Sequence, residues 1–368
     1  MSTTLDSVAL DFATLDEIHA AALASLTEPV RDFLEGGSGD EITLRNNRRA
    51  FERWALRPRI MGGLGVPSTA TTFMGVPLEL PVLTAPFGAD ALFDPEGQIA
   101  VARANLRMGT ASIAPEAGSH PVEEVAIAGR QAAAFGQLHP MGPEDNFLRM
   151  LDRYEIAGYQ AFCVTCDCPT AGWRERNMHN RFVPPTEVIG GNYPAGGDIA
   201  LETVFGQLFY NDQPVWSWDK LGELMRHSSL PWMAKGIMTP EDAVAAVAAG
   251  ASGLLVSNHG GRQLDGVMAS LDALPAIRDA VGPSVSIALD SGVRRGTDIV
   301  KAIALGADVV VLGRLAVYGL AAGGEAGVVR VMELLAEEIT TVLTLLGRGG
   351  IAELDRSALV RVGGGFDD

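Results

Sequence analysis

The chain has 368 residues, of which 47% are hydrophobic and 20% charged, with a formal net charge of −17 and a pI of about 4.8. This composition is ordinary for a folded globular protein and excludes a disordered chain. An acidic protein of this kind repels phosphate backbones and acidic membrane surfaces, so we expect no nucleic-acid partner. An anionic ligand would need a local cluster of arginine and lysine.

The N-terminus begins Met1-Ser-Thr-Thr-Leu-Asp6 and has neither the basic nor the apolar region of a signal peptide. No stretch approaches the ~18 apolar residues of a membrane-spanning helix. We therefore expect a cytoplasmic protein without a membrane span. The length could hold two domains, but α/β barrels of this size are commonly one, and we expect residues 1–368 to form a single domain.

Residues 1–79 are predicted to be an N-terminal helical and extended segment, with a helical stretch from Leu15 to Leu34 that ends at a glycine-rich turn. From Leu80 onward one unit repeats: a short apolar run, a polar turn, an amphipathic helix and a glycine. Asp94-Pro95 and Thr239-Pro240 are typical of helix starts. Glycines suited to left-handed helix ends are Gly109, Gly158, Gly250 and Gly306.

The apolar runs number eight and lack the alternation of a half-exposed strand. Eight parallel strands, each followed by a helix and buried on both sides, predict a (β/α)8 TIM barrel over residues 80–345, with a C-terminal tail at 346–368. A doubly wound sheet would need a glycine-rich loop after its first strand, which Ala85-Pro86-Phe87-Gly88 does not provide. The runs are Leu80–Thr84, Thr110–Ala114, Ala132–Leu138, Ala161–Cys166, Trp232–Lys235, Gly253–Val256, Val285–Leu289 and Val309–Leu312.

The fourth connection is much longer than the others. It runs from Cys166 to Pro231 and carries paired prolines and glycines together with Phe205, Phe209 and Tyr210, which we predict to be exposed. Long connections in compact domains are commonly lids, so we expect residues 183–218 to form a lid-like insertion over the chemical face.

The three cysteines, Cys163, Cys166 and Cys168, crowd into one strand-like segment. Their spacing could suggest a metal or redox site, but no second Cys or His pair completes it. We therefore expect no metal and interpret them as reduced core thiols.

Polar and glycine residues follow the strands, where the ligands of parallel barrels bind. A single His or Arg at a strand end is more often structural, yet a structural role would have to explain the whole set at once. Glycines and arginines after the last two strands suit a phosphate. A second subset offers one base, one carboxylate and three cations, which suits an acidic small substrate: His259, Asp167, Lys235, Arg262 and Arg174. The set is Gln137, His139, Thr165, Asp167, Arg174, Lys235, His259, Arg262, Asp290, Gly292, Arg294, Gly313 and Arg314.

The sequence resembles the FMN-dependent enzymes that oxidise 2-hydroxy acids, the family of glycolate oxidase, lactate oxidase and mandelate dehydrogenase. The similarity extends over nearly the whole chain, and its ordered motifs are far more specific together than singly. They include Asn46–Phe51, Asp94-Pro-Glu-Gly97, Val122-Glu-Glu-Val125, Thr165-Cys-Asp-Cys-Pro169, Lys235-Gly236, Ser257-Asn-His-Gly-Gly-Arg-Gln-Leu-Asp265, Asp290-Ser-Gly-Val-Arg294 and Leu312-Gly-Arg314.

The resemblance implies FMN as cofactor, a small anionic substrate, oxygen or another electron acceptor, and a homotetramer. It also implies that His259 is the catalytic base, oriented by Asp167, and that Lys235 lies against the flavin. Arg262 and Arg174 would bind the substrate carboxylate. The implied cofactor-binding residues are Pro86, Gln137, Thr165, Lys235, Ser257, Asp290, Gly292, Arg294, Gly313 and Arg314.

Two substrate-binding positions depart from the family. Phe33 and His139 stand where the family usually has tyrosines, and Phe33 cannot donate a hydrogen bond whereas His139 can. We therefore expect a bulkier or aryl 2-hydroxy acid, or a related alcohol or amine, rather than glycolate or lactate. The alternatives left open are a different FMN or phosphate-binding barrel, such as a flavin-dependent isomerase, and a catalytically silent barrel.

Overall fold

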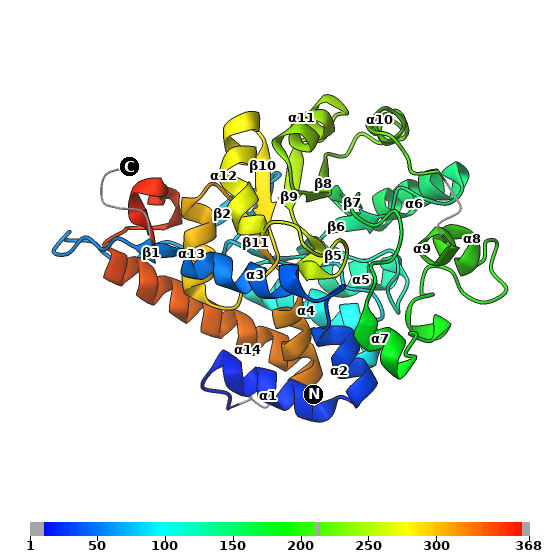
Figure 1. Cartoon of the computed structure of the whole chain (residues 1–368), viewed down its shortest axis with the longest axis horizontal. Helices are drawn as coiled ribbons and strands as arrows, with labels where there is room; N and C mark the ends of the chain where they lie inside the picture. Colours follow the sequence, from blue (N-terminus) through cyan, green and yellow to red (C-terminus); the bar gives the residue numbers. More distant parts are fainter. Residues whose placement is uncertain (1–10, 211–213, 363–368) are drawn as a thin grey trace, which may run out of the picture.

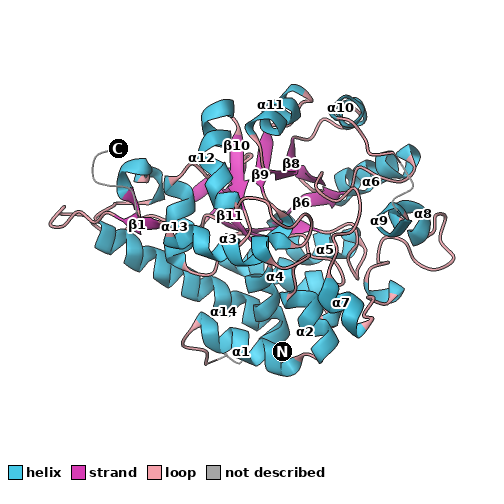
Figure 2. Cartoon of the chain, viewed as in Figure 1, coloured by secondary structure: helices cyan, strands magenta, loops and turns pink. Residues whose placement is uncertain are grey.

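The computed structural model describes residues 11–210 and 214–362, and its centre is a closed barrel of eight parallel strands surrounded by helices (Figure 2). Neighbouring strands pair in the order β10-β11-β4-β5-β6-β7-β8-β9, which closes on itself. The predicted (β/α)8 barrel is thus confirmed. The strands are β4 Val82–Thr84, β5 Ala111–Ala114, β6 Ala133–Leu138, β7 Ala161–Thr165, β8 Trp232–Ile237, β9 Gly253–Val256, β10 Ser286–Leu289 and β11 Val309–Leu312.

The barrel strands coincide with the eight apolar runs to within two residues at each end. Nearly all their residues are buried, because one side of each strand faces the barrel interior and the other faces a helix. The helices are α1 Leu15–Ser25, α2 Glu28–Glu35, α3 Ile42–Glu52, α4 Gly97–Met108, α5 Val122–Gly129, α6 Glu144–Ala157, α7 Glu175–Asn180, α8 Leu201–Phe205, α9 Gln207–Tyr210, α10 Trp218–Met225, α11 Pro240–Ala248, α12 Ser270–Val281, α13 Gly296–Ala304 and α14 Arg314–Leu346.

Helix ends follow the sequence signals with two exceptions. Thr239 caps α11 as predicted, with its side chain accepting the Asp242 N–H. The stretch predicted as one helix from Leu15 to Leu34 is two helices, because Pro29 lies in the first turn of α2 and cannot continue α1. Helix α4 begins at Gly97, later than Asp94-Pro95 indicated. All four glycines expected at helix ends have positive φ: Gly109, Gly158, Gly250 and Gly306.

An antiparallel hairpin outside the barrel sheet, β2 Thr71–Phe73 with β3 Val76–Leu78, packs into the barrel core. Phe73 is fully buried, and its ring centroid lies 5.9 Å from that of Phe135 in β6. Met74 approaches Gly253, the first residue of β9, so the hairpin covers the amino-terminal end of the barrel. The carboxyl-terminal end is left for ligands.

Two distant parts of the chain lie against the barrel from outside. Helix α1 packs along α14, as Figure 1 shows at the lower edge of the molecule. The short strand β1 (Trp54–Leu56) pairs antiparallel with β12 (Leu359–Arg361), so residues after α14 lie beside the N-terminal segment.

The insertion at 183–218 contains a short 3-10 helix (Thr186–Val188), α8, α9 and the start of α10. The prediction that its aromatics are exposed is wrong for Phe205, which is 3% exposed because it packs on His139 and Tyr193. Tyr210 is 74% exposed, as predicted, and the Phe209 side chain lies outside the described residues.

In the ranges 11–210 and 214–362, no helix combines the length and hydropathy needed to cross a membrane.

Candidate active site

A cavity of about 400 Å³ opens where the carboxyl ends of the barrel strands meet. It is lined by every site residue predicted from the sequence except Asp167 and Ser257. Closure of the barrel explains this convergence, because residues that follow parallel strands all lie at one rim. Asp167 and Ser257 lie behind the lining, where they contact residues that reach the cavity.

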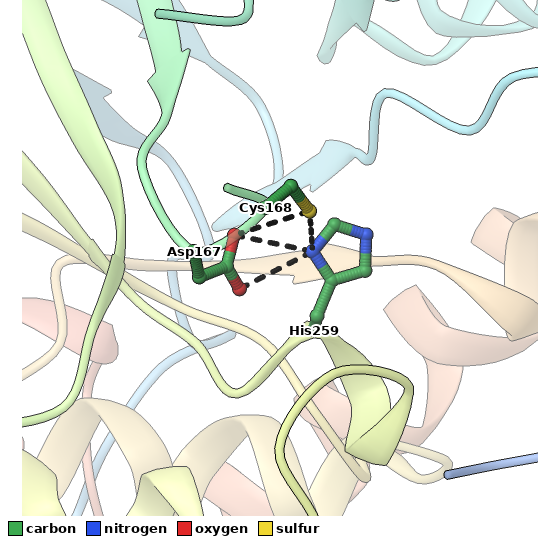
Figure 3. Close-up of side chains that lie close together, drawn as sticks. All are labelled: Asp167, Cys168 and His259. Carbon is green, nitrogen blue, oxygen red and sulfur yellow. Dashed lines mark hydrogen bonds and ion pairs between the residues drawn. The ribbon is translucent and has the colours of Figure 1, made fainter. Parts of the chain in front are cut away.

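His259 begins a short 3-10 helix, η4 (His259–Gly261), three residues after β9. Its backbone is left-handed, with φ of 59°, and its N–H donates to the Ser257 hydroxyl at 3.0 Å. Its Nδ1 lies 3.2 Å from both carboxylate oxygens of Asp167, which follows β7 (Figure 3). This carboxylate fixes the tautomer by accepting the Nδ1 proton, so Nε2 is the nitrogen left to accept a proton from a ligand.

Lys235 lies in β8 and is 4% exposed. Its Nζ is 3.1 Å from His259 Nδ1 and 3.6 Å from the nearer oxygen of Asp167. Burial opposes charge on Lys235, but the carboxylates of Asp167 and Asp290 outweigh it and raise the pKa of the ammonium group. Burial likewise opposes the Asp167 charge, and Lys235 with His259 holds the pKa of that carboxyl well below its usual range.

Burial and the charge of Lys235 lower the pKa of His259 to about 4, because they outweigh the opposing effect of Asp167. The imidazole is therefore neutral at physiological pH. A neutral imidazole with an adjacent carboxylate has the charge state that a general base needs.

Cys168 also contacts His259, although the sequence did not predict it to be a site residue. Its Sγ lies 3.4 Å from His259 Nδ1, and burial raises the pKa of the thiol, so it stays protonated (Figure 3). Asp167, Cys168 and His259 place their ligand atoms within 4.8 Å of one another, a grouping that could hold a metal ion. The Lys235 ammonium occupies the same neighbourhood and opposes a second cation there.

Arg262 and Arg174 lie beside His259 at the cavity. Arg262 donates to the carbonyl oxygens of Phe33 (2.5 Å) and Gly36 (3.3 Å), and Arg174 donates to the Arg262 carbonyl (3.2 Å). Among the described residues neither guanidinium forms an ion pair with a carboxylate. Burial lowers the pKa of both side chains. Two half-buried cations without an acidic partner in the described part of the chain form a site for an anionic ligand.

A second cationic region lies after β10 and β11. The Arg314 side chain donates to backbone carbonyls at Leu34 and Gly260, and burial lowers its pKa to about 10. Arg294 donates to the Tyr318 hydroxyl at 2.9 Å. A Cβ at Gly313, the residue before α14, would meet no atom within 4 Å, so backbone there borders open space at a helix N-terminus. Such a region suits a phosphate group.

Further polar groups line the cavity between these two cationic regions. Gln137 donates from Nε2 to Thr165 Oγ1 at 3.0 Å, and both residues are buried. Asp290 follows β10, and burial raises the pKa of its carboxyl despite the opposing charge of Lys235. Pro86 and Gly292 complete the wall; Gly292 has φ of 99°, and a Cβ there would lie 2.5 Å from the Asn47 carbonyl oxygen.

The two residues that depart from the resemblance both reach the cavity. The Phe33 ring lies beneath Arg262, with the guanidinium carbon 5.0 Å from the ring centroid. His139 Nδ1 lies 3.0 Å from Oε2 of Glu116, a residue that the sequence did not identify. Glu116 follows β5. Neither hydrophobic periodicity nor a glycine motif in this stretch distinguished Glu116 from a residue of a surface turn.

The match to known families decides the chain's class. The model of a protein family described as FMN-dependent dehydrogenase matches residues 22–361. The chain belongs to this family. An L-lactate oxidase of Nostoc sp. is 40% identical over 357 residues, covering 94% of this chain and 97% of the relative. Glycolate oxidase of Spinacia oleracea is 37% identical over 357 residues, covering 95% of each chain.

Solved structures of relatives superpose closely on this chain. A mandelate oxidase with (S)-2-phenylpropionate gives a TM-score of 0.86 at 36% identity, covering 95% of this chain and 98% of that chain. The same protein type with benzoyl-formic acid gives the same TM-score, identity and coverage. The resemblance identified from sequence motifs is confirmed, and with it the expectation of an FMN enzyme. The match favours an oxidoreductase over the isomerase and the silent barrel.

The donors around the cavity fit FMN. The arginines and the α14 N-terminus would hold its phosphate, and the Gln137 and Thr165 side chains offer a polar edge to its ring. Lys235 adds a buried positive charge deep in the same cavity.

Proposed function

We propose that this protein oxidises a 2-hydroxy acid to the 2-oxo acid, and that the substrate is bulkier than glycolate or lactate. FMN, when bound, takes up the two electrons that the substrate releases. The observation that carries the proposal is the neutral His259 imidazole, bonded to Asp167, in the same cavity as two half-buried arginines that have no carboxylate partner among the described residues. The substrate class is supported by relatives that are named L-lactate oxidase, glycolate oxidase and mandelate oxidase.

Each proposed step belongs to a residue of this chain. Arg262 and Arg174 bind the substrate carboxylate and thereby place the 2-hydroxyl near His259. His259 accepts the hydroxyl proton at Nε2, and the Asp167 carboxylate stabilises the imidazolium that forms. Oxidation of the C–OH group removes two electrons and two protons in all: the hydroxyl proton goes to His259, and the hydrogen of the 2-carbon and the two electrons would be taken up by FMN. Lys235 supplies positive charge where electrons are received.

The proposed bulk of the substrate rests on the cavity wall. Phe33 presents an apolar ring and no hydroxyl, and Ala171 lines the same cavity with a small side chain. An apolar wall beside a carboxylate-binding arginine accommodates an aryl or branched side chain. Oxidation of a related alcohol or amine would use the same base without the arginine pair, so the arginines favour the acid.

Anaerobic reduction tests the proposal directly. The purified protein is mixed with glycolate, lactate, mandelate and larger aryl 2-hydroxy acids, and bleaching of flavin absorbance near its visible maximum is followed. We expect fast bleaching by an aryl or branched acid. Efficient turnover of glycolate would contradict the proposed substrate, and no bleaching by any acid would contradict the reaction. Exposure of the reduced protein to air then distinguishes an oxidase from a dehydrogenase.

The homotetramer implied by the resemblance and the cytoplasmic location expected from the sequence both stay predictions. Light scattering of the purified protein and fractionation of its source cells would test the two parts separately.

A further inference from the structure

Glu116 is a buried carboxylate that the proposed reaction does not use, and it lies behind His139, which lines the cavity. It is 2% exposed and follows β5. Its Oε2 accepts the backbone N–H of His139 at 2.8 Å and lies 3.0 Å from His139 Nδ1. Within the described part of the chain, His139 is its only ion-pair partner. A carboxylate this deeply buried needs such partners, which ties Glu116 to His139.

The surrounding hydrogen bonds define which ring nitrogen of His139 carries the proton. A carboxylate oxygen only accepts, so Nδ1 holds its hydrogen toward Glu116. The Gln137 amide is oriented by two bonds: its Oε1 accepts the Glu116 N–H, and its Nε2 donates to Thr165, both at 3.0 Å. The same Gln137 Nε2 lies 3.2 Å from both ring nitrogens, so it faces the ring without being directed at the lone pair of either one. Because Nδ1 holds its proton toward Glu116, the lone pair of His139 Nε2 is the acceptor that remains for a ligand.

The insertion supplies the rest of this arrangement. The Tyr193 hydroxyl donates to Glu116 Oε1 at 2.5 Å and accepts from Asn146 at 3.1 Å. The ring of Phe205 lies edge-on to His139, with centroids 5.3 Å apart and planes at 89°. Tyr193 and Phe205 both belong to residues 183–218, so the insertion packs against the imidazole from one side while Glu116 bonds it from another.

We propose that Glu116 and Tyr193 are positioning residues that hold His139 with Nε2 as a hydrogen-bond acceptor for the substrate, and that the insertion thereby sets substrate specificity. A fixed acceptor binds a hydroxyl or N–H of the substrate. A tyrosine in place of His139 would instead donate its phenol hydrogen to the substrate carboxylate. The carboxylate is left to Arg262 and Arg174. This inference rests on the proposed function, and it adds a substrate class: acids that carry a hydrogen-bond donor within reach of His139.

The test measures whether Glu116 acts through His139. Flavin reduction by mandelate and 4-hydroxymandelate is compared in the wild type, Glu116→Gln, His139→Gln and the double variant. We expect Glu116→Gln to lower kcat/KM for 4-hydroxymandelate about tenfold and that for mandelate, which lacks the second hydroxyl donor, less; tenfold is the size expected for losing a charge-assisted hydrogen bond that orients a side chain. In the His139→Gln background the same change should add no further loss. An equal loss in both backgrounds, or no loss at all, would overturn the proposal.

Two matched pairs control for folding. Tyr193→Phe removes one hydroxyl and should lower kcat/KM in the same direction, whereas Tyr210→Phe, at an exposed tyrosine of the same insertion, should leave it unchanged. Glu202→Gln changes an exposed glutamate of α8 and is the control for Glu116→Gln, so it should leave kcat/KM unchanged. A Tyr193→Phe variant with wild-type kinetics would exclude the insertion from the mechanism. Thermal unfolding and flavin content verify that every variant is folded.

Ligand binding separates this inference from the proposed function. Dissociation constants for phenylacetate and 4-hydroxyphenylacetate, which differ by one hydroxyl donor and carry no 2-hydroxyl to oxidise, are read from perturbation of the flavin spectrum, without turnover. If no 2-hydroxy acid reduces the wild type, the proposed function fails, while these constants still report the coupling of Glu116 to His139. If each ligand binds the wild type and Glu116→Gln with the same dissociation constant, the positioning role is overturned.

Discussion

His259 and Asp167 are separated by 92 residues in the chain, yet Nδ1 of the imidazole lies 3.2 Å from both carboxylate oxygens. They follow different strands, β9 and β7, and β8 between them carries Lys235. Three consecutive barrel strands thus place a base, its carboxylate and a cation in contact. Burial and the charge of Lys235 outweigh the charge of Asp167 and keep the base neutral.

Replacing the base should separate catalysis from cofactor binding. His259→Ala should keep its flavin but slow substrate reduction by roughly 10²–10⁴-fold, the usual contribution of general-base catalysis. Stopped-flow absorbance measures the rate, and denaturation measures the FMN released. His179→Ala, at a histidine in α7 that does not line the cavity, is the control. Loss of flavin together with activity in His259→Ala would mean that His259 holds the cofactor instead.

The pH dependence of kcat/KM should report His259. The base works only when neutral, and its pKa is lowered to about 4 by burial and Lys235. Activity should therefore be level around neutral pH and fall as the pH drops through about 4. Lys235→Met removes the cation that lowers this pKa, so its acidic limb should move to higher pH. An acidic limb that stays in place or moves lower would contradict the assignment.

Arg262 should contribute to substrate binding through its planar guanidinium. Arg262→Lys retains the charge but loses paired donors, and we expect kcat/KM to fall about 10- to 100-fold. Steady-state kinetics with the best 2-hydroxy acid measures the change. Arg226→Lys, at an exposed position after α10, should behave as the wild type. A Lys variant as active as the wild type would show that Arg262 serves mainly to hold the Phe33 and Gly36 carbonyls.

Phe33 should restrict small substrates. Phe33→Tyr adds a hydroxyl donor beside Arg262, and we expect kcat/KM for glycolate and lactate to rise about tenfold, while larger acids change little. Phe182→Tyr is the matched control, because its ring packs on Phe33 (5.7 Å between centroids) without lining the cavity. If Phe33→Tyr leaves the preference among acids unchanged, position 33 does not determine specificity.

The cationic region after β10 and β11 should recognise the phosphate of FMN. Arg294→Met should weaken FMN binding about 10- to 100-fold but leave riboflavin, which lacks the phosphate, almost unaffected. Flavin fluorescence during reconstitution of the apoprotein measures both affinities. Arg295→Met, at a half-exposed arginine paired with Glu338, is the control. A parallel loss of FMN and riboflavin affinity would contradict phosphate recognition by Arg294.

The family relationship and the barrel could be read from the sequence because both depend on local patterns. Each apolar run needs burial on two sides, and the glycine at each helix end needs a left-handed backbone, so eight repeats of this unit specify a closed barrel. The same logic placed His259, Lys235 and Arg314 at one rim. Motif spacing then predicted the family, which the comparisons confirm.

Contacts between side chains were decided only by the tertiary structure. Cys168 appeared to be one of three core thiols, but barrel closure brings it to 3.4 Å from His259. Glu116 and Tyr193 belong to segments far apart in the sequence. Only packing of the insertion brings the Tyr193 hydroxyl to the Glu116 carboxylate. Phe205 was predicted to be exposed because an irregular connection has no periodicity to reveal its buried side. Periodicity determines which residues face a rim, whereas long-range packing determines which of them touch.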